Sequence, residues 1–216
     1  MKNETFAAPS CQYYTQEKAF LYHLIPDGPN AILDLGCAAG RLGRKLLELK
    51  KASTVHGVEI FPEAAEEAAA SYVKVHVGDI EEMELPYNQD FDVVICGDIL
   101  EHLKEPRKVV ARIRNWLKPG GHLICCVPNV RYWRVCRDLV CKGRWDYAGE
   151  GIMDATHLRF FTRQSLRKML SEASFKVEYE GFNLAGGRKH ELLNTVTMGA
   201  LKDFLGYQII MSARKP

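Results

Sequence analysis

The stretch Ala31-Ile-Leu-Asp-Leu-Gly-Cys-Ala-Ala-Gly40 decides the fold of this 216-residue chain. Its apolar first half predicts a buried parallel strand that ends at Gly36, because strands covered on both faces read as continuous hydrophobic runs. Small residues follow, and a helix is predicted from Arg41 onward. A strand, a glycine-containing turn and a helix N-terminus together offer backbone N–H groups on which a ligand can lie directly.

The dinucleotide-binding pattern G-x-G-x-x-G does not fit this turn. Gly36 can supply the first glycine, but Ala38 and Arg41 occupy the other two positions. The Arg41 side chain would crowd a pyrophosphate at the point where the pattern needs the backbone to approach closely. The turn therefore does not favour a dinucleotide ligand.

Two acidic residues follow at the ends of further predicted strands. Glu59 closes the run 53–60 and lies 25 residues beyond Asp34, close to the spacing at which an acid binds ribose hydroxyls. The run 72–80 predicts a third strand that ends at Asp79. Because ligands bind outside the carboxyl ends of parallel strands, we expect these acids to face the same ligand.

The rest of the chain continues the alternation of strands and helices. Its pattern predicts an amphipathic helix at 130–141 and another helix at 163–173, capped by Thr162. We predict strands at 91–97 and 122–128, the second introduced by a Leu117-Lys-Pro-Gly-Gly121 turn, and two final strands at 175–182 and 207–213. Strands that alternate with helical segments indicate a parallel sheet with helices on both faces.

Three motifs together resemble class I S-adenosylmethionine (SAM)-dependent methyltransferases. They are Asp34-x-Gly36-x-Ala38-x-Gly40, the segment 98–103 (Asp-Ile-Leu-Glu-His-Leu) and the Leu-Lys-Pro-Gly-Gly turn, in the family's order. The resemblance covers roughly residues 20–216. It implies one α/β domain over 1–216, a doubly wound, seven-stranded, mostly parallel Rossmann-like sheet. An N-terminal cap helix within 1–28 and a helical and loop lid inserted after the fifth strand, at 129–161, complete the expected architecture.

The resemblance implies that the chain binds SAM and releases S-adenosylhomocysteine. No metal is expected, because the cysteines lack the spacing of a zinc site. Glu59 would hold the ribose hydroxyls, Asp79 would accept from the adenine amino group, and the residues after the fourth strand would line the methionine part. The expected cofactor residues are Asp34, Gly36, Cys37, Ala38, Gly40, Glu59, Ile60, Gly78, Asp79, Ile80, Gly97, Asp98 and His102.

The predicted lid carries the candidate residues for chemistry and for the acceptor. His is the side chain best suited to take a proton near neutral pH, so His157 and His102 are candidate general bases, with Asp154 orienting His157. Structural roles, a hydrogen bond that fixes the lid or a packing contact, are the alternatives for both histidines. Candidate acceptor-binding residues are Tyr14, Asn129, Arg131, Trp145, Tyr147 and Arg159.

The lid sequence also resembles a bacterial methyltransferase subgroup associated with surface polysaccharides and nucleotide-sugars. Residues 131–168 hold nine Lys or Arg and four acids, a basic surplus that favours an acidic small-molecule acceptor, although a solvated helical face would read the same. A sugar or nucleotide-sugar is therefore the expected substrate, methylated on O or N. Methylation of RNA or protein, or SAM binding without catalysis, are the alternatives.

The composition of the chain bears on its cellular location and its partners. The chain is 47% hydrophobic with a net charge of +2, and it shows neither a secretion signal nor an apolar run that could span a membrane. The seven cysteines form no C-x-x-C pair, and Cys37, Cys96, Cys125 and Cys126 fall in strands, where a free thiol packs as a small hydrophobe. We expect a cytoplasmic monomer or homodimer without a nucleic-acid partner.

Overall fold

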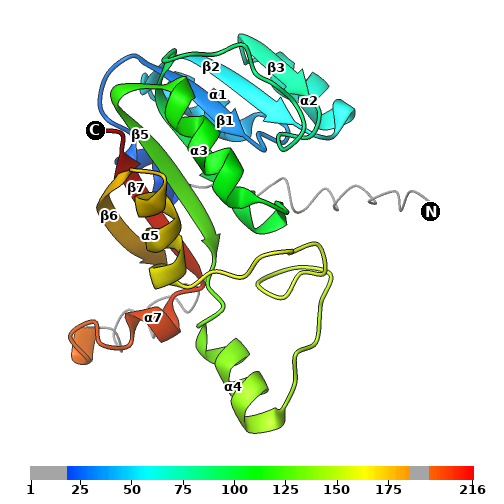
Figure 1. The fold of residues 1–216 in the computed structure, drawn as a ribbon, viewed down its shortest axis with the longest axis vertical. Helices are drawn as coiled ribbons and strands as arrows, with labels where there is room; N and C mark the ends of the chain where they lie inside the picture. The colour runs from blue at the N-terminus through cyan, green and yellow to red at the C-terminus, as the bar shows by residue number, and fades with distance from the viewer. Residues whose placement is uncertain (1–18, 185–194) are drawn as a thin grey trace. The chain divides into compact units, whose positions relative to one another are not determined.

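A computed structural model describes residues 19–184 and 195–216 of the chain (Figure 1). Contacts divide the chain into two compact units, unit 1 over Met1–Glu84 and unit 2 over Leu85–Pro216. Each unit is described by itself below. The expectation of a single domain over 1–216 stays a prediction.

Unit 1 contains three parallel strands in the order β3-β2-β1. They span Asn30–Leu35 (β1), Ala52–Glu59 (β2) and Lys74–Val77 (β3), and the helices Arg41–Glu48 (α1) and Pro62–Ala69 (α2) connect them. The α1 helix packs on β2, and α2 packs on β2 and β3. The parallel register places the carboxyl ends of the three strands along one edge, as the sequence predicts.

The N-terminal helix and the third strand differ from expectation in extent. Within the described part of the predicted cap, residues Ala19–Leu24 form a 3-10 helix (η2). The third strand begins at Lys74 and not at Tyr72, whose side chain turns inward and is 6% exposed.

Unit 2 contains four strands in the order β4-β5-β7-β6. They span Phe91–Gly97 (β4), Leu117–Pro128 (β5), Lys176–Asn183 (β6) and Gln208–Arg214 (β7). The β4–β5 pair is parallel, and β7 runs antiparallel to both β5 and β6. In Figure 1 the helices Pro106–Trp116 (α3) and Arg163–Glu172 (α5) lie on the same face of these strands, α3 against β5 and α5 against β6 and β7.

The Leu-Lys-Pro-Gly-Gly motif is a bulge inside β5 and not a turn before it. Phe91 pairs with Leu117 while Val93 pairs with His122, so the motif inserts extra residues opposite β4. Gly120 takes a left-handed φ of 80°, and its N–H donates to the carbonyl of Lys215. A bulge with one residue in the left-handed region satisfies the same sequence preferences as a turn.

The predicted helix boundaries near the lid are nearly correct. The helix expected at 163–173 is α5, capped by Thr162 through a capping box with Ser165. The helix expected at 130–141 begins three residues later, at Trp133–Lys142 (α4), because Asn129 folds the intervening chain into a turn. Figure 1 shows α4 and the loop after it beyond the carboxyl end of β5. That this segment closes over a ligand as a lid stays a prediction.

The remaining elements are short. A 3-10 turn (η3) covers Leu100–His102, directly after β4, and α7 covers Lys202–Leu205 before β7. The thiols of Cys37, Cys96, Cys125 and Cys126 are free and buried, as predicted. No helix in 19–184 or 195–216 is both long and apolar enough to cross a membrane.

Candidate active site

The turn after β1 in unit 1 is a tight backbone loop. Gly36, Ala38 and Gly40 all adopt left-handed conformations, with φ of 69°, 47° and 73°. Gly36 and Cys37 both donate their N–H to the carbonyl of Val58 on β2. A Cβ on Gly40 would lie 2.8 Å from the Ala68 Cα on α2, so this position excludes any larger residue without movement of the helix.

Glu59 joins the three segments expected to hold the cofactor. Its Oε2 accepts from Ala38 N–H at 2.8 Å, and its Oε1 accepts from the N–H groups of Ile60 and Phe61 at 2.9 and 3.0 Å. Its backbone carbonyl accepts from Gly78 N–H at 2.9 Å. One buried carboxylate residue thus ties the β1 turn, the end of β2 and the end of β3 together.

Beyond these bonds, the edge of unit 1 presents one apolar and one acidic side chain. Ile60 is 53% exposed although it is a large aliphatic residue. Asp79 follows β3, and its Oδ1 accepts from Glu81 N–H at 2.8 Å. Ile80 is buried beside it. The cofactor candidates Glu59, Ile60, Asp79 and Ile80 lie at or just after the ends of β2 and β3, and their contact with a cofactor stays a prediction.

Asp34 is held by Tyr72, a residue that the sequence analysis placed only in a strand. The Tyr72 hydroxyl donates to Asp34 Oδ2 at 2.7 Å and accepts from Gly43 N–H at 3.0 Å. Burial, followed by the nearby Asp34 charge, raises the pKa of Tyr72 well above its usual range, so the hydroxyl keeps its proton. Burial likewise raises the pKa of the Cys37 thiol, which excludes a reactive thiolate in this turn.

We predict that Tyr72→Phe weakens unit 1 by about 2 kcal/mol, because a buried carboxylate loses a donor and an amide loses an acceptor. Urea denaturation followed by circular dichroism measures this loss. Tyr147→Phe, at a ring that is 56% exposed, is the control and should leave the free energy of unfolding unchanged. Equal stability of the two variants would contradict the assigned hydrogen bonds.

In unit 2, the residues after β4 are fixed by the antiparallel strands. Asp98 has a left-handed φ of 56°, and its N–H donates to the carbonyl of Cys126. Its Oδ1 accepts from Gln208 Nε2 at 2.6 Å, and Gln208 Oε1 accepts from Asn183 Nδ2 at 2.9 Å. Gly97, the last residue of β4, precedes this network directly. Gln208 and Asn183 come from distant strands, and no local pattern points to them.

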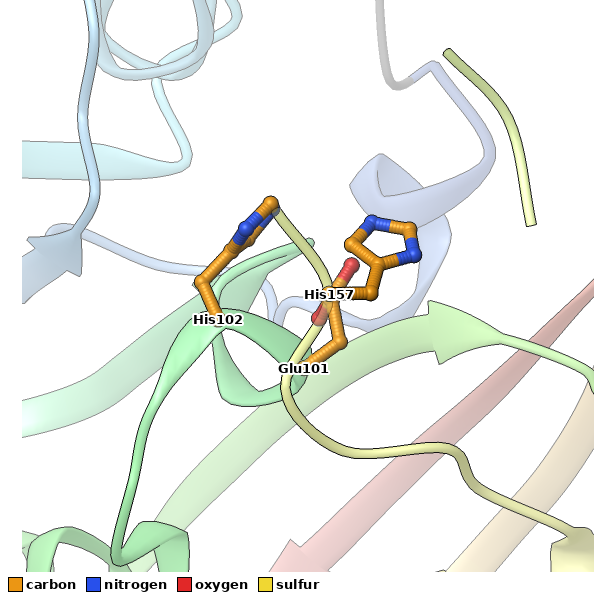
Figure 2. Close-up of side chains that lie close together, drawn as sticks. All are labelled: Glu101, His102 and His157. Carbon is orange, nitrogen blue, oxygen red and sulfur yellow. The ribbon is translucent and has the colours of Figure 1, made fainter. Parts of the chain in front are cut away.

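Figure 2 shows Glu101, His102 and His157 gathered in one cluster, the first two on η3 and the third on the segment after α4. One possible ligand atom from each residue lies within 4.8 Å of the others. The two imidazole rings meet edge to face with centroids 4.8 Å apart. The N–H groups of Leu158 and Arg159 both donate to the Glu101 carbonyl, which fastens the segment to η3.

The hydrogen bonds define which nitrogen each imidazole uses. His157 Nδ1 lies 3.0 Å from the carbonyl of Ile152, which can only accept, so Nδ1 is the donor. His102 Nδ1 lies 3.3 Å from the carbonyl of Thr156 and 3.2 Å from its hydroxyl. The Thr156 hydroxyl gives its hydrogen to Asp154 Oδ1 at 2.7 Å, so it accepts from His102. In the neutral form of either ring, these contacts therefore leave the lone pair on Nε2.

Asp154 acts on a different partner from the one expected. Its Oδ1 accepts from the N–H and the hydroxyl of Thr156, and the carboxylate thereby supports His102 through Thr156. His157 is oriented by a backbone carbonyl instead. Burial, followed by the proximity of His157, lowers the pKa of His102, which keeps that ring neutral near pH 7.

The other expected substrate residues of unit 2 fall into two groups. Asn129 and Arg131 make structural contacts: Asn129 Nδ2 donates to the carbonyls of Asp203 and Gly206, and Arg131 pairs with the Asp203 carboxylate. Trp145 and Tyr147 are exposed and share ring contacts with Phe160.

Arg159 donates to the backbone carbonyls of Lys104 and Leu158, which places its guanidinium beside η3. Tyr14 lies outside the described residues. Among the residues the sequence analysis did not select, Glu101 had a signal, since it stands directly before His102 in a recognisable motif.

The basic surplus of residues 131–168 is largely neutralised. Six of its nine cations lie in ion pairs with carboxylates: Arg131, Arg137, Lys142, Arg163, Arg167 and Lys168. Arg134 instead lies over the Trp133 ring. The surface that this segment offers to an acidic ligand is therefore smaller than the residue count predicts.

Comparison with known proteins gives a family match. Residues 12–180 match the model of a family described as a methyltransferase domain. The chain is 37% identical over 105 residues to a malonyl-[acyl-carrier protein] O-methyltransferase of Halalkalibacterium halodurans, an alignment covering 45% of this chain and 39% of that protein. It is 28% identical over 104 residues to a ubiquinone biosynthesis O-methyltransferase of Xanthomonas oryzae pv. oryzae, covering 45% and 43%. The chain thus matches less than half the length of either relative.

The fold has solved counterparts. A crystal structure of an S-adenosylmethionine dependent methyltransferase from Mesorhizobium loti matches with a TM-score of 0.65 at 19% identity, over 90% of this chain and 95% of that one. The expected α/β class, a mixed and mostly parallel arrangement of seven strands with flanking helices, is confirmed.

Proposed function

Because the chain belongs to the methyltransferase domain family, we propose that it transfers a methyl group from SAM to an oxygen or nitrogen atom of a small-molecule acceptor. The observation that carries this proposal is the joining role of Glu59. A carboxylate that ties together the turn after β1 and the ends of β2 and β3 supports the binding of one nucleoside along that edge.

The residues of unit 1 fit SAM in chemistry as well as in position. Glu59 Oε2 accepts from the Ala38 amide, and a carboxylate oxygen has room for a second donor, which a ribose hydroxyl would supply. The exposed Ile60 side chain offers an apolar surface for the adenine ring, and Asp79 offers an acceptor for its amino group. Gly36, Ala38 and Gly40, all with left-handed φ, bear at most a methyl side chain, which would let the cofactor approach the backbone of the turn.

Unit 2 supplies groups for the acceptor. Methyl transfer from a sulfonium is a one-step displacement, in which alignment of nucleophile and methyl can account for about 7–11 kcal/mol of the barrier. A hydroxyl acceptor also has to lose its proton. We propose that the cluster of His102 and His157 activates it, with Nε2 of either ring as the accepting atom and Asp154 supporting His102 through Thr156.

An oxygen acceptor is favoured over nitrogen because both relatives are named as O-methyltransferases. Within that class we propose a sugar or nucleotide-sugar, on the resemblance of the segment 129–161. Trp145, Tyr147 and Arg159 are proposed as its contacts. The buried free thiols support a cytoplasmic location.

Two experiments test the proposal. Isothermal titration of the protein with SAM should give one site per chain, with NAD as the negative control; preference for NAD would overturn the fold-level assignment. Transfer of a radiolabelled methyl group should then be measured on nucleotide-sugars, carboxylic acids and bulk tRNA. Labelling of tRNA alone would favour the macromolecular alternative, and SAM binding without any transfer would favour a regulator.

We predict that His157→Ala lowers methyl transfer by at least about 100-fold while SAM affinity stays normal, because a positioned acid or base supplies a factor of about 10²–10⁴. Initial rates with the identified acceptor and calorimetry with SAM provide the two measurements. His76→Ala, a change on β3 outside the cluster, is the matched control. Unchanged turnover in a folded His157→Ala protein would remove His157 from the mechanism.

A further inference from the structure

We propose that Glu101, His102 and His157 form a binding site for a divalent transition-metal ion. These residues bring one carboxylate and two imidazole groups to one place, with the ligand atoms within 4.8 Å of one another (Figure 2). Ligand atoms about 2.1 Å from a shared tetrahedral ion lie about 3.4 Å apart, so side-chain movements of about 1–1.5 Å would bring the three ligand atoms onto one ion.

The hydrogen bonds already prepare both histidines as ligands. Each ring donates Nδ1–H, His157 to the Ile152 carbonyl and His102 to Thr156, and so leaves its lone pair on Nε2. Histidines that bind metals typically donate the other ring N–H to a carbonyl or carboxylate, which fixes the tautomer and the ring orientation. Asp154 in turn fixes the Thr156 side chain, because its carboxylate accepts from the Thr156 hydroxyl.

The charge around the cluster favours a cation. The Glu101 side chain belongs to a residue that is 1% exposed, and Asp98 and Asp154 act on His102 with further negative charge. His157 is 6% exposed, so the cluster is shielded from bulk water. A divalent ion would compensate carboxylate charge in a setting where water does so poorly.

The donor set indicates which ions fit. Two imidazole nitrogens and one carboxylate are typical ligands of Zn²⁺, Fe²⁺, Co²⁺ and neighbouring ions, whereas Mg²⁺ and Ca²⁺ prefer sites made of oxygen. Three protein ligands leave at least one coordination position open, as in catalytic rather than structural zinc sites. The sequence analysis expected no metal because the cysteines lack a zinc spacing, but this set uses no cysteine.

The site deepens the proposed function and rests on it for its role. An acceptor hydroxyl bound at the open position would lose its proton to solvent more readily, because a bound cation lowers the pKa of its ligand. The oxygen then forms the bond to the methyl carbon, and the electron pair of the carbon–sulfur bond remains on sulfur. With the ion bound, the two histidines are ligands and the acceptor needs no protein base.

The metal site can be tested without any substrate. The full chain is treated with EDTA, dialysed and titrated with Co²⁺, whose visible absorption reports coordination by nitrogen and oxygen ligands. We expect saturation at one equivalent and displacement of Co²⁺ by Zn²⁺. His157→Ala and Glu101→Gln should each weaken binding by about 100-fold or more, while His76→Ala binds as the wild type does.

Two results would overturn the site: absence of the Co²⁺ spectrum in the folded wild type, or equal binding by the wild type and Glu101→Gln. The Gln variant keeps the size of the buried side chain, so it guards against misfolding of His157→Ala. Failure of the proposed function has a different signature, since a protein that binds Co²⁺ normally but neither binds SAM nor transfers methyl retains the site and loses the function. Full methyl transfer after EDTA treatment, with no Co²⁺ spectrum, would instead overturn the metal site and retain the proposed function.

Discussion

Glu59→Ala is expected to abolish SAM binding at accessible concentrations and to lower the free energy of unfolding by about 3 kcal/mol. Three backbone amides, those of Ala38, Ile60 and Phe61, donate to this one carboxylate. Hydrogen bonds to charged groups contribute about 1.5–3 kcal/mol each, and their loss is less than additive because the amides regain water. Calorimetry with SAM and urea denaturation measure the two effects.

A conservative change separates binding from folding at the same position. Glu59→Gln keeps one acceptor oxygen and the side-chain size but puts an NH₂ group where an amide or a ribose hydroxyl needs an acceptor. We expect it to be more stable than Glu59→Ala and still at least about 10-fold weaker in SAM affinity. Glu63→Ala, on the exposed first turn of α2, is the control. Normal SAM affinity of a folded Glu59→Ala protein would exclude Glu59 from the cofactor site.

Asn129→Ala is expected to destabilise unit 2 by about 2–4 kcal/mol. The residue is 1% exposed; its Nδ2 donates to the carbonyls of Asp203 and Gly206 at 2.7 and 2.9 Å, and its Oδ1 accepts from Arg131 N–H at 3.1 Å. Removal of the amide leaves these backbone groups unpaired in the interior, where each carries a desolvation cost. Thermal and urea denaturation provide the measurement.

The controls decide between a structural and an acceptor-binding role for Asn129. Asn129→Asp removes both donors and brings a carboxylate against two carbonyl oxygens, so we expect a loss at least as large as for alanine. Asn115→Ala, on the exposed side of α3, should have no effect on stability. A raised KM for the acceptor with unchanged stability of Asn129→Ala would instead support the role first expected from the sequence.

Strand positions were predictable because burial determines both the fold and the hydrophobic pattern. The runs that became β2, β4, β6 and β7 were located within a residue or two, and Thr162 identified the start of α5. Strand boundaries were predicted wrongly where a tertiary side-chain contact outweighs the local preference for strand. Tyr72 looks like a strand residue, yet its hydroxyl reaches Asp34 and shortens β3.

The candidate site was predictable only in part, for a similar reason. Acids at strand ends follow from periodicity and spacing, so Glu59 and Asp79 were found. The direction of a hydrogen bond is a tertiary property: Asp154 and His157 are three residues apart, yet Asp154 bonds Thr156 and His157 bonds Ile152. No sequence pattern predicts that η3 and the segment after α4 come together around Glu101.

The two amide bonds from Leu158 and Arg159 to the Glu101 carbonyl have a consequence for protein engineering. They anchor the histidine-bearing part of the segment, while residues 143–150 before it are all exposed. Ala148 is tied to the same segment, since its N–H donates to the Met153 carbonyl and its carbonyl accepts from Ala155 N–H. We therefore expect residues 144–147 to accept other sequences while the cluster keeps its geometry. Under the proposed function, such grafts would change the contacts made with the acceptor and leave the histidine cluster in place.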